Sequence, residues 1–162
     1  MTLGILWPVV RRLGALSLFV VGAVHLREYS DAYSAIPTIG PLFMLNFVAA
    51  TVLGVGLLLP VELLLPRWRT AFVALLALGG VGLSATSLVM LWIAERRPLF
   101  GFMEPGYDPD MIQLARISEV VTVVLLGAYL LALIFGGSRD RGPDSGKQPT
   151  EETPQTTSLG AG

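Results

Sequence analysis

The sequence contains no cysteine, and this absence excludes several kinds of chemistry at once. Thiol redox reactions, disulfide exchange, thiolate metal sites and iron–sulfur clusters all depend on cysteine sulfur. His25 is the only histidine, so one chain cannot hold haems through pairs of histidines. No carboxylate at metal-ligand spacing accompanies His25 in the helix predicted for residues 8–27. The sequence therefore predicts no metal, no cofactor and no set of catalytic residues.

Charged residues are also scarce, since they make up 14% of the 162 residues while hydrophobic residues make up 53%. A soluble domain carries roughly 25% charged residues. The mean hydropathy of +0.68 agrees with this contrast. The net charge of -1 provides no basic surface, which argues against nucleic acid as a partner. The composition therefore predicts a membrane protein whose first partner is the lipid bilayer.

The strongest pattern in the chain is the run 71–94, which holds 24 residues without a charge or a proline. At ~1.5 Å per residue, a helix of this length crosses a hydrocarbon layer ~30 Å thick. Weaker apolar runs accompany it, so the predicted spans are about 8–27, 41–65, 71–94 and 110–136. Residues 138–162 have almost no apolar side chains, and such a segment cannot bury enough surface to fold. We therefore predict an all-α, four-helix transmembrane bundle with a disordered C-terminal tail.

The ends of these segments carry helix signals. Asp108 and Pro109 fit the N-cap and the first residue of the last span, and Pro60 predicts an end or a kink in the second. The first span also admits the interpretation of a cleaved signal peptide, because Arg11 and Arg12 precede a short apolar run. The run is not followed by the pattern of alternating small residues that marks a signal-peptide cleavage site. An uncleaved span is therefore the preferred interpretation.

Small residues recur at short spacings in the second and third spans, at Ala50, Gly54, Ala77, Gly80, Ser84 and Ser87. In lipid, small residues allow helices to approach one another closely. The pattern predicts close packing within the bundle, with formation of a homo-oligomer as the alternative.

Arginine and lysine are distributed unevenly between the two ends of the predicted bundle. One end has seven of them in its flanks: Arg11, Arg12, Arg67, Arg69, Arg139, Arg141 and Lys147. The opposite end has Arg27, Arg96 and Arg97 in its loops, with Arg116 just inside the fourth span. Positively charged flanks stay in the cytoplasm. We therefore predict a transmembrane domain over residues 1–137 with both termini, including the tail 138–162, in the cytoplasm.

The lengths of the spans place polar residues inside the hydrocarbon. Only 14 residues separate Arg12 from Arg27, which is about 21 Å of helix. Six side chains lie at similar depths in the predicted spans and can reach one polar layer in the outer third of the membrane: His25, Arg27, Asn46, Ser87, Arg116 and Glu119. Arg116 precedes Glu119 by three residues and is expected to pair with it. Three interpretations of this layer remain open. It is an ion pair that locks the helices together, a site for a ligand or a proton, or a simple exposure of Glu119 at the membrane interface.

The two loops at the predicted outer face are longer than the inner loop. They span residues 28–40 and 95–110 and contain the candidate contact residues Tyr29, Tyr33, Glu104 and Tyr107. Loops carry binding residues more often than scaffolds do. Aromatic residues of this kind also seat loops at a membrane interface, so the sequence leaves both interpretations open.

Several short motifs carry a resemblance to known proteins: residues 22–26 (GAVHL), 36–43 (IPTIGPLF), 45–46 (LN), 100–102 (FGF) and 104–107 (EPGY), with Tyr33 and Glu119. On these residues the chain resembles small four-span membrane proteins of high-GC Gram-positive bacteria, over about residues 13–136. The resemblance implies a bacterial plasma membrane and the same topology, and it implies no activity. The architecture alone is similar to that of DoxX-type proteins, without a motif for quinone-linked chemistry.

Three functions are consistent with these patterns. The first is a non-enzymatic accessory protein whose outer loops and polar layer engage a partner membrane protein or a lipid. The second is a small oligomeric proton-coupled transporter in which Glu119 titrates. The third, by analogy, is an oxidoreductase subunit that binds a quinone near His25.

Overall fold

The backbone is almost entirely helical in the residues that the computed structural model describes, which are 3–60, 67–106 and 108–137. These residues form α1 (Leu3–Glu28), the π-helical turn η1 (Tyr29–Tyr33), α2 (Ile39–Leu58), α4 (Arg69–Ala94) and α5 (Pro109–Gly137). In this part of the chain four helices are long and apolar enough to cross a membrane. The predicted all-α four-helix bundle is confirmed, and the helices indicate a multi-pass membrane protein.

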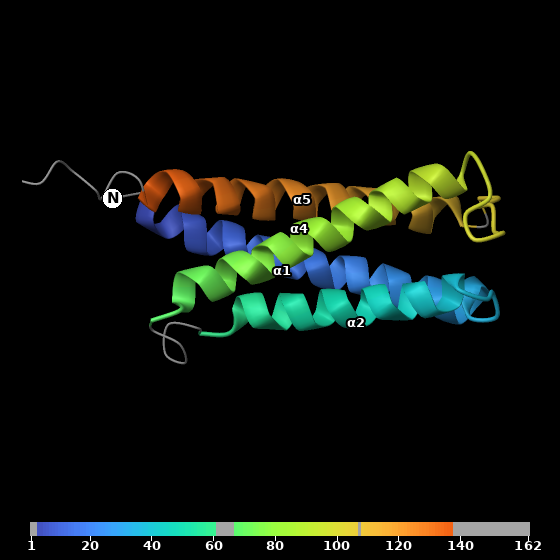
Figure 1. Cartoon of the computed structure of the whole chain (residues 1–162), viewed down its shortest axis with the longest axis horizontal. Helices are drawn as coiled ribbons and strands as arrows, with labels where there is room; N and C mark the ends of the chain where they lie inside the picture. Colours follow the sequence, from blue (N-terminus) through green and yellow to red (C-terminus); the bar gives the residue numbers. More distant parts are fainter. Residues whose placement is uncertain (1–2, 61–66, 107, 138–162) are drawn as a thin grey trace, which may run out of the picture.

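The helices form an elongated bundle in which α1 contacts both α2 and α5 (Figure 1). The loop after α1 and the loop after α4 lie together at one end of the bundle. Helix α4 starts beside α2 at the opposite end, crosses α1, and finishes beside α5. As a result, α2 and α4 diverge toward the end that carries the two long loops.

The first helix is longer than the predicted span of residues 8–27. It begins at Leu3, ends at Glu28, and continues without a break into η1, where the Ser34 amide donates to the Tyr29 carbonyl at 2.9 Å. The prediction of a loop from residue 28 is therefore wrong. Glu28 and Tyr33 are buried, and a helical backbone satisfies the hydrogen bonds that buried residues require.

The boundaries of the other helices follow the proline and aspartate signals. Helix α2 ends at Leu58, earlier than the predicted residue 65, and Leu59 adopts the extended conformation (ψ 145°) that a residue before proline prefers. The Asp108 side chain accepts a hydrogen bond from the Met111 amide at 3.1 Å, which confirms the predicted N-cap of α5. Residues 61–66 and the tail 138–162 lie outside the described residues.

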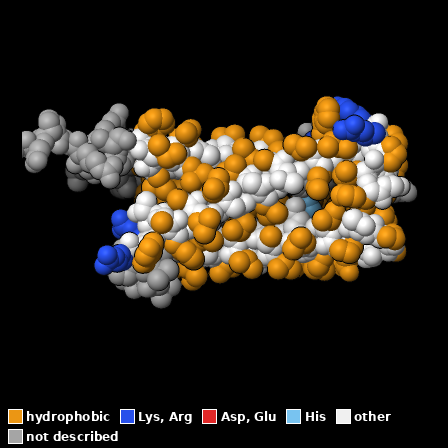
Figure 2. Space-filling view, viewed as in Figure 1, with side chains coloured by type: hydrophobic (Ala, Val, Ile, Leu, Met, Phe, Trp, Pro, Cys, Tyr) orange, Lys and Arg blue, Asp and Glu red, His pale blue; other side chains and the backbone are white. Residues whose placement is uncertain are grey.

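The core of the bundle is built on small residues of α4. Ala77 and Ser84 are fully buried, and a Cβ atom at Gly80 would lie 2.6 Å from Leu126 of α5. The small face of this helix therefore packs within the chain, as predicted for close helix contact. Large apolar side chains face outward instead, and Figure 2 shows them along the whole length of the bundle, with arginine side chains near its two ends.

Candidate functional site

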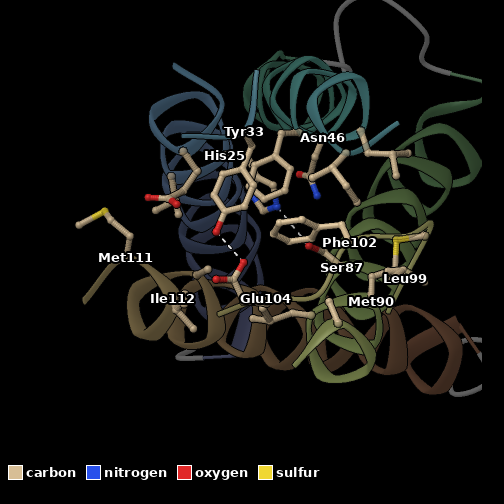
Figure 3. A pocket seen from close by; sticks show the side chains of 18 of the residues that line it. His25, Tyr33, Asn46, Ser87, Met90, Leu99, Phe102, Glu104, Met111 and Ile112 are labelled. Carbon is tan, nitrogen blue, oxygen red and sulfur yellow. Dashed lines mark hydrogen bonds between the residues drawn. The ribbon is translucent and has the colours of Figure 1, made fainter. Parts of the chain in front are cut away.

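A cavity of about 120 Å³ lies near the end of the bundle that carries the two long loops, where α1, α2, α4 and α5 all contribute side chains. Most of its wall is apolar. Its polar lining residues are His25, Glu28, Tyr33, Asn46, Ser87, Glu104 and Glu119. Figure 3 shows the side chains of the lining residues arranged around this space.

His25 lies at the floor of the cavity and is held in one orientation by α1 itself. Its Nδ1 atom lies 2.9 Å from the Val21 carbonyl oxygen. A carbonyl only accepts hydrogen bonds, so Nδ1 carries the proton and donates. In the neutral ring Nε2 is then an acceptor, and the Ser87 hydroxyl, 3.2 Å away, donates to it.

Glu119 is the most unusual residue of the floor, because its side chain is 1% exposed and neither oxygen meets the geometry of a hydrogen bond, although the Ser87 hydroxyl lies close by. Among the described residues, neither carboxyl oxygen of Glu119 has a hydrogen-bond partner, nor does Oδ1 of Asn46. The nearest basic atom is Nε2 of His25 at 3.8 Å from Oε1, which is too long for a hydrogen bond. Burying a carboxyl without a hydrogen-bond partner is costly, and a bound group that donates hydrogen bonds to Glu119 would offset that cost.

The roof of the cavity is a contact between η1 and the loop after α4. The Tyr33 hydroxyl donates to Oε2 of Glu104 at 2.5 Å, and the other oxygen, Oε1, accepts from the Gly106 amide at 2.9 Å. The Tyr33 ring stacks on Phe43 at 4.6 Å and meets the edge of Phe102 at 5.7 Å. These contacts fix the roof above the polar floor.

The two predicted arginines lie outside the cavity. The Arg27 side chain is 58% exposed and pairs with Asp31 at 3.4 Å. Arg116 forms an ion pair with Glu95 at the end of α4. The expected pairing of Arg116 with Glu119 is therefore wrong. The spacing of three residues puts both on one side of α5, but the long Arg116 side chain reaches outward to the neighbouring helix while Glu119 points inward.

The structure brings together His25, Asn46, Ser87 and Glu119 at the floor, with Tyr33 and Glu104 in the roof. Tyr29 lies against α2 on a separate part of the surface, and Tyr107 lies outside the described residues. Sequence reasoning missed Glu28, Phe43 and Phe102 as lining residues. For Glu28 and Phe43 a signal existed, because each lies three residues from a predicted floor residue, on the same helix face.

The cavity opens sideways, between α2 and α4. Figure 2 shows a hollow between these two helices with a histidine side chain visible in it, and His25 is the only histidine of the chain. Toward the opposite end the floor is closed by Leu18, Val21 and Leu126, which are fully buried. The cavity is therefore reached from the apolar flank of the bundle and does not extend through it.

Together, fold and site define a four-helix, multi-pass membrane protein with an internal cavity near one end. No group of three or more His, Asp or Glu side chains within the described residues could hold a metal ion. No protein-family model, curated protein or solved structure matches the chain.

Proposed function

We propose that the chain is a non-enzymatic accessory protein of a bacterial plasma membrane that binds a small amphipathic molecule in this cavity. One observation carries the proposal: the buried Glu119 carboxyl lines a cavity and has no hydrogen-bond partner in the described chain. Ligand sites combine apolar walls with a few polar groups that fix orientation, and the cavity has this composition.

The proposed orientation places both termini in the cytoplasm and the cavity in the outer leaflet. The excess of arginine at the end opposite the cavity supports this orientation. A ligand would then enter from the outer leaflet through the opening between α2 and α4. The outer loops would contact a partner membrane protein that delivers the ligand or receives it.

A second candidate, a proton-coupled transporter, is favoured by two titratable side chains that lie 3.8 Å apart inside the bundle, His25 and Glu119, because such groups mark proton pathways in membrane proteins. The closed floor around Leu18 and Leu126 argues for the binding protein, since a carrier must also open to the other side. Proteoliposome flux that is lost in Glu119→Gln would favour the transporter.

Filling the cavity is expected to remove the bound molecule. Ala115 lines the cavity, whereas Ala71 is exposed on the apolar surface of α4, so Ala115→Leu and Ala71→Leu form a matched pair. Native mass spectrometry of protein extracted in mild detergent should show a small molecule on the wild type and on Ala71→Leu. The added mass of this molecule should be absent from the spectrum of Ala115→Leu.

Two results would contradict the proposed function. One is a wild-type spectrum with no retained molecule after gentle extraction. The other is a molecule that Ala115→Leu retains as fully as Ala71→Leu, because that molecule would sit outside the cavity.

A further inference from the structure

We propose that the cavity selects a cationic amphipath, a molecule with an ammonium head and a short apolar body, and that Glu119 is its counter-ion. This inference rests on the proposed function, because it names the class of ligand for the same cavity. Four properties of the cavity support it: its charge, its hydrogen-bonding groups, its aromatic wall and its shape.

The charges that line the cavity all have one sign. Glu28, Glu104 and Glu119 contribute carboxyl groups, and no arginine or lysine among the described residues lines it. The nearest arginines in sequence, Arg27 and Arg116, are paired elsewhere. A low-dielectric cavity lined by one sign of charge attracts the opposite sign and excludes its own. An anionic ligand is therefore disfavoured.

The unpartnered atoms of the floor are oxygens, and they act as acceptors when Glu119 is ionised. Both Glu119 oxygens and Oδ1 of Asn46 are unpartnered, and the acceptor nitrogen of neutral His25 already receives the Ser87 hydroxyl. A ligand that satisfies these atoms must donate hydrogen bonds. An ammonium group has up to three donors and no acceptor, and its charge matches an ionised Glu119.

The wall next to this floor is aromatic. The Phe43 ring lies 5.2 Å from the His25 ring and 4.6 Å from Tyr33, and Phe102 closes the same space (Figure 3). The faces of aromatic rings attract cations, an effect that grows when the cation is desolvated. The aromatic wall therefore favours an ammonium head over a neutral one of the same size.

The size and opening of the cavity limit the ligand. A volume of about 120 Å³ is close to the ~150 Å³ cavity that holds one benzene molecule. It accommodates an ammonium head and a few carbon atoms. The opening between α2 and α4 faces the apolar surface (Figure 2), so a longer hydrocarbon tail can extend into lipid.

Hexylammonium is the probe that fits these limits, and hexanoate and hexanol are its anionic and neutral counterparts. Isothermal titration calorimetry uses the full-length protein in a neutral maltoside detergent. Hexylammonium should bind the wild type at least about tenfold more tightly than hexanol, and hexanoate should not bind. This comparison requires no variant, so it remains valid even if a substitution prevents folding.

Variants then assign the effect to Glu119. Glu119→Gln should weaken hexylammonium binding by about tenfold or more, since an ion pair is lost. Asp31→Asn removes an exposed carboxyl at the same end of the bundle and should leave binding unchanged. Ala115→Leu should abolish binding.

The outcomes separate the inference from the proposed function. If hexanol, hexanoate or a short-chain benzoquinone binds as tightly as hexylammonium and Ala115→Leu removes that binding, the cavity is a ligand site but the cation assignment is wrong. If Ala115→Leu changes the binding of none of these probes, the proposed function fails as well. Equal hexylammonium binding by wild type and Glu119→Gln also overturns the assignment.

Discussion

Replacing Gly80 with leucine is expected to destabilise the bundle by about 3 kcal/mol or more, the upper end of the cost of overpacking a core. A Cβ atom at Gly80 would lie 2.6 Å from a methyl carbon of Leu126 and 3.2 Å from one of Leu18. Both leucines are fully buried. They belong to α5 and α1, so the added side chain must displace buried side chains of two helices.

Gly82 is the matched control, because it lies on the same helix and a Cβ atom there would meet no heavy atom within 4 Å. Through packing, the added side chain of Gly82→Leu should change the free energy of unfolding by less than about 0.5 kcal/mol. Leucine also has a higher helix propensity than glycine, which adds a small stabilisation. Unfolding in mixed detergent micelles, followed by circular dichroism, measures both variants. Equal stabilities for the two variants would contradict the packing described for α4.

Replacing Glu119 with leucine is expected to stabilise the unliganded protein, by about 1–3 kcal/mol. The buried carboxyl has no hydrogen bond, so its removal relieves a desolvation cost of that order. An ion pair that locks the helices predicts the opposite sign, since removing one partner of a buried pair costs about 3–5 kcal/mol. The sign of the change therefore distinguishes a ligand site from a structural lock.

Thr122, one turn further along α5, provides the comparison. Its hydroxyl is fully buried and contacts Ser17 of α1 at 2.5 Å and the Ser118 carbonyl at 2.8 Å. Thr122→Val should lose about 1 kcal/mol, the usual contribution of a polar contact between membrane helices. If Glu119→Leu is destabilised more than Thr122→Val in the same assay, Glu119 is structural and the ligand argument loses its basis.

The sequence predicted those parts of the fold that depend on local chemistry. Asp108 caps a helix because its side chain reaches an amide three residues away, and residues before Pro60 leave the helix because proline restricts the preceding backbone. The presence of four membrane spans followed from the length of the apolar runs in the sequence. The depth of Glu119 in its span predicted a place in the outer polar layer, whereas its burial between the helices depends on how they pack.

The parts that could not be predicted depend on contacts between distant residues. Tyr33 and Glu104 are 71 positions apart, and only the folded bundle brings them together in the roof. The partner of Arg116 could not be read from spacing, because the competing Glu95 lies on another helix. The cavity itself arises from the divergence of α2 and α4, and no residue pattern encodes a helix crossing by itself.

The proposed ligand site is open at its flank and selects positive charge, and thiol labelling tests both properties. The chain has no cysteine, so a single introduced thiol reports its own surroundings. Ser87 is half-buried and lines the cavity, whereas Ser84 lies one turn below on the same helix, is fully buried, and does not line it. The two serines therefore form a matched pair for thiol labelling.

The measurement is the rate at which Ser87→Cys and Ser84→Cys react with aminoethyl methanethiosulfonate, a cation, and with sulfonatoethyl methanethiosulfonate, an anion. We predict that the cation modifies Ser87→Cys at least about tenfold faster than the anion does, and that neither reagent modifies Ser84→Cys. Equal rates for the two reagents at Ser87→Cys, or modification of both variants at similar rates, would contradict this prediction.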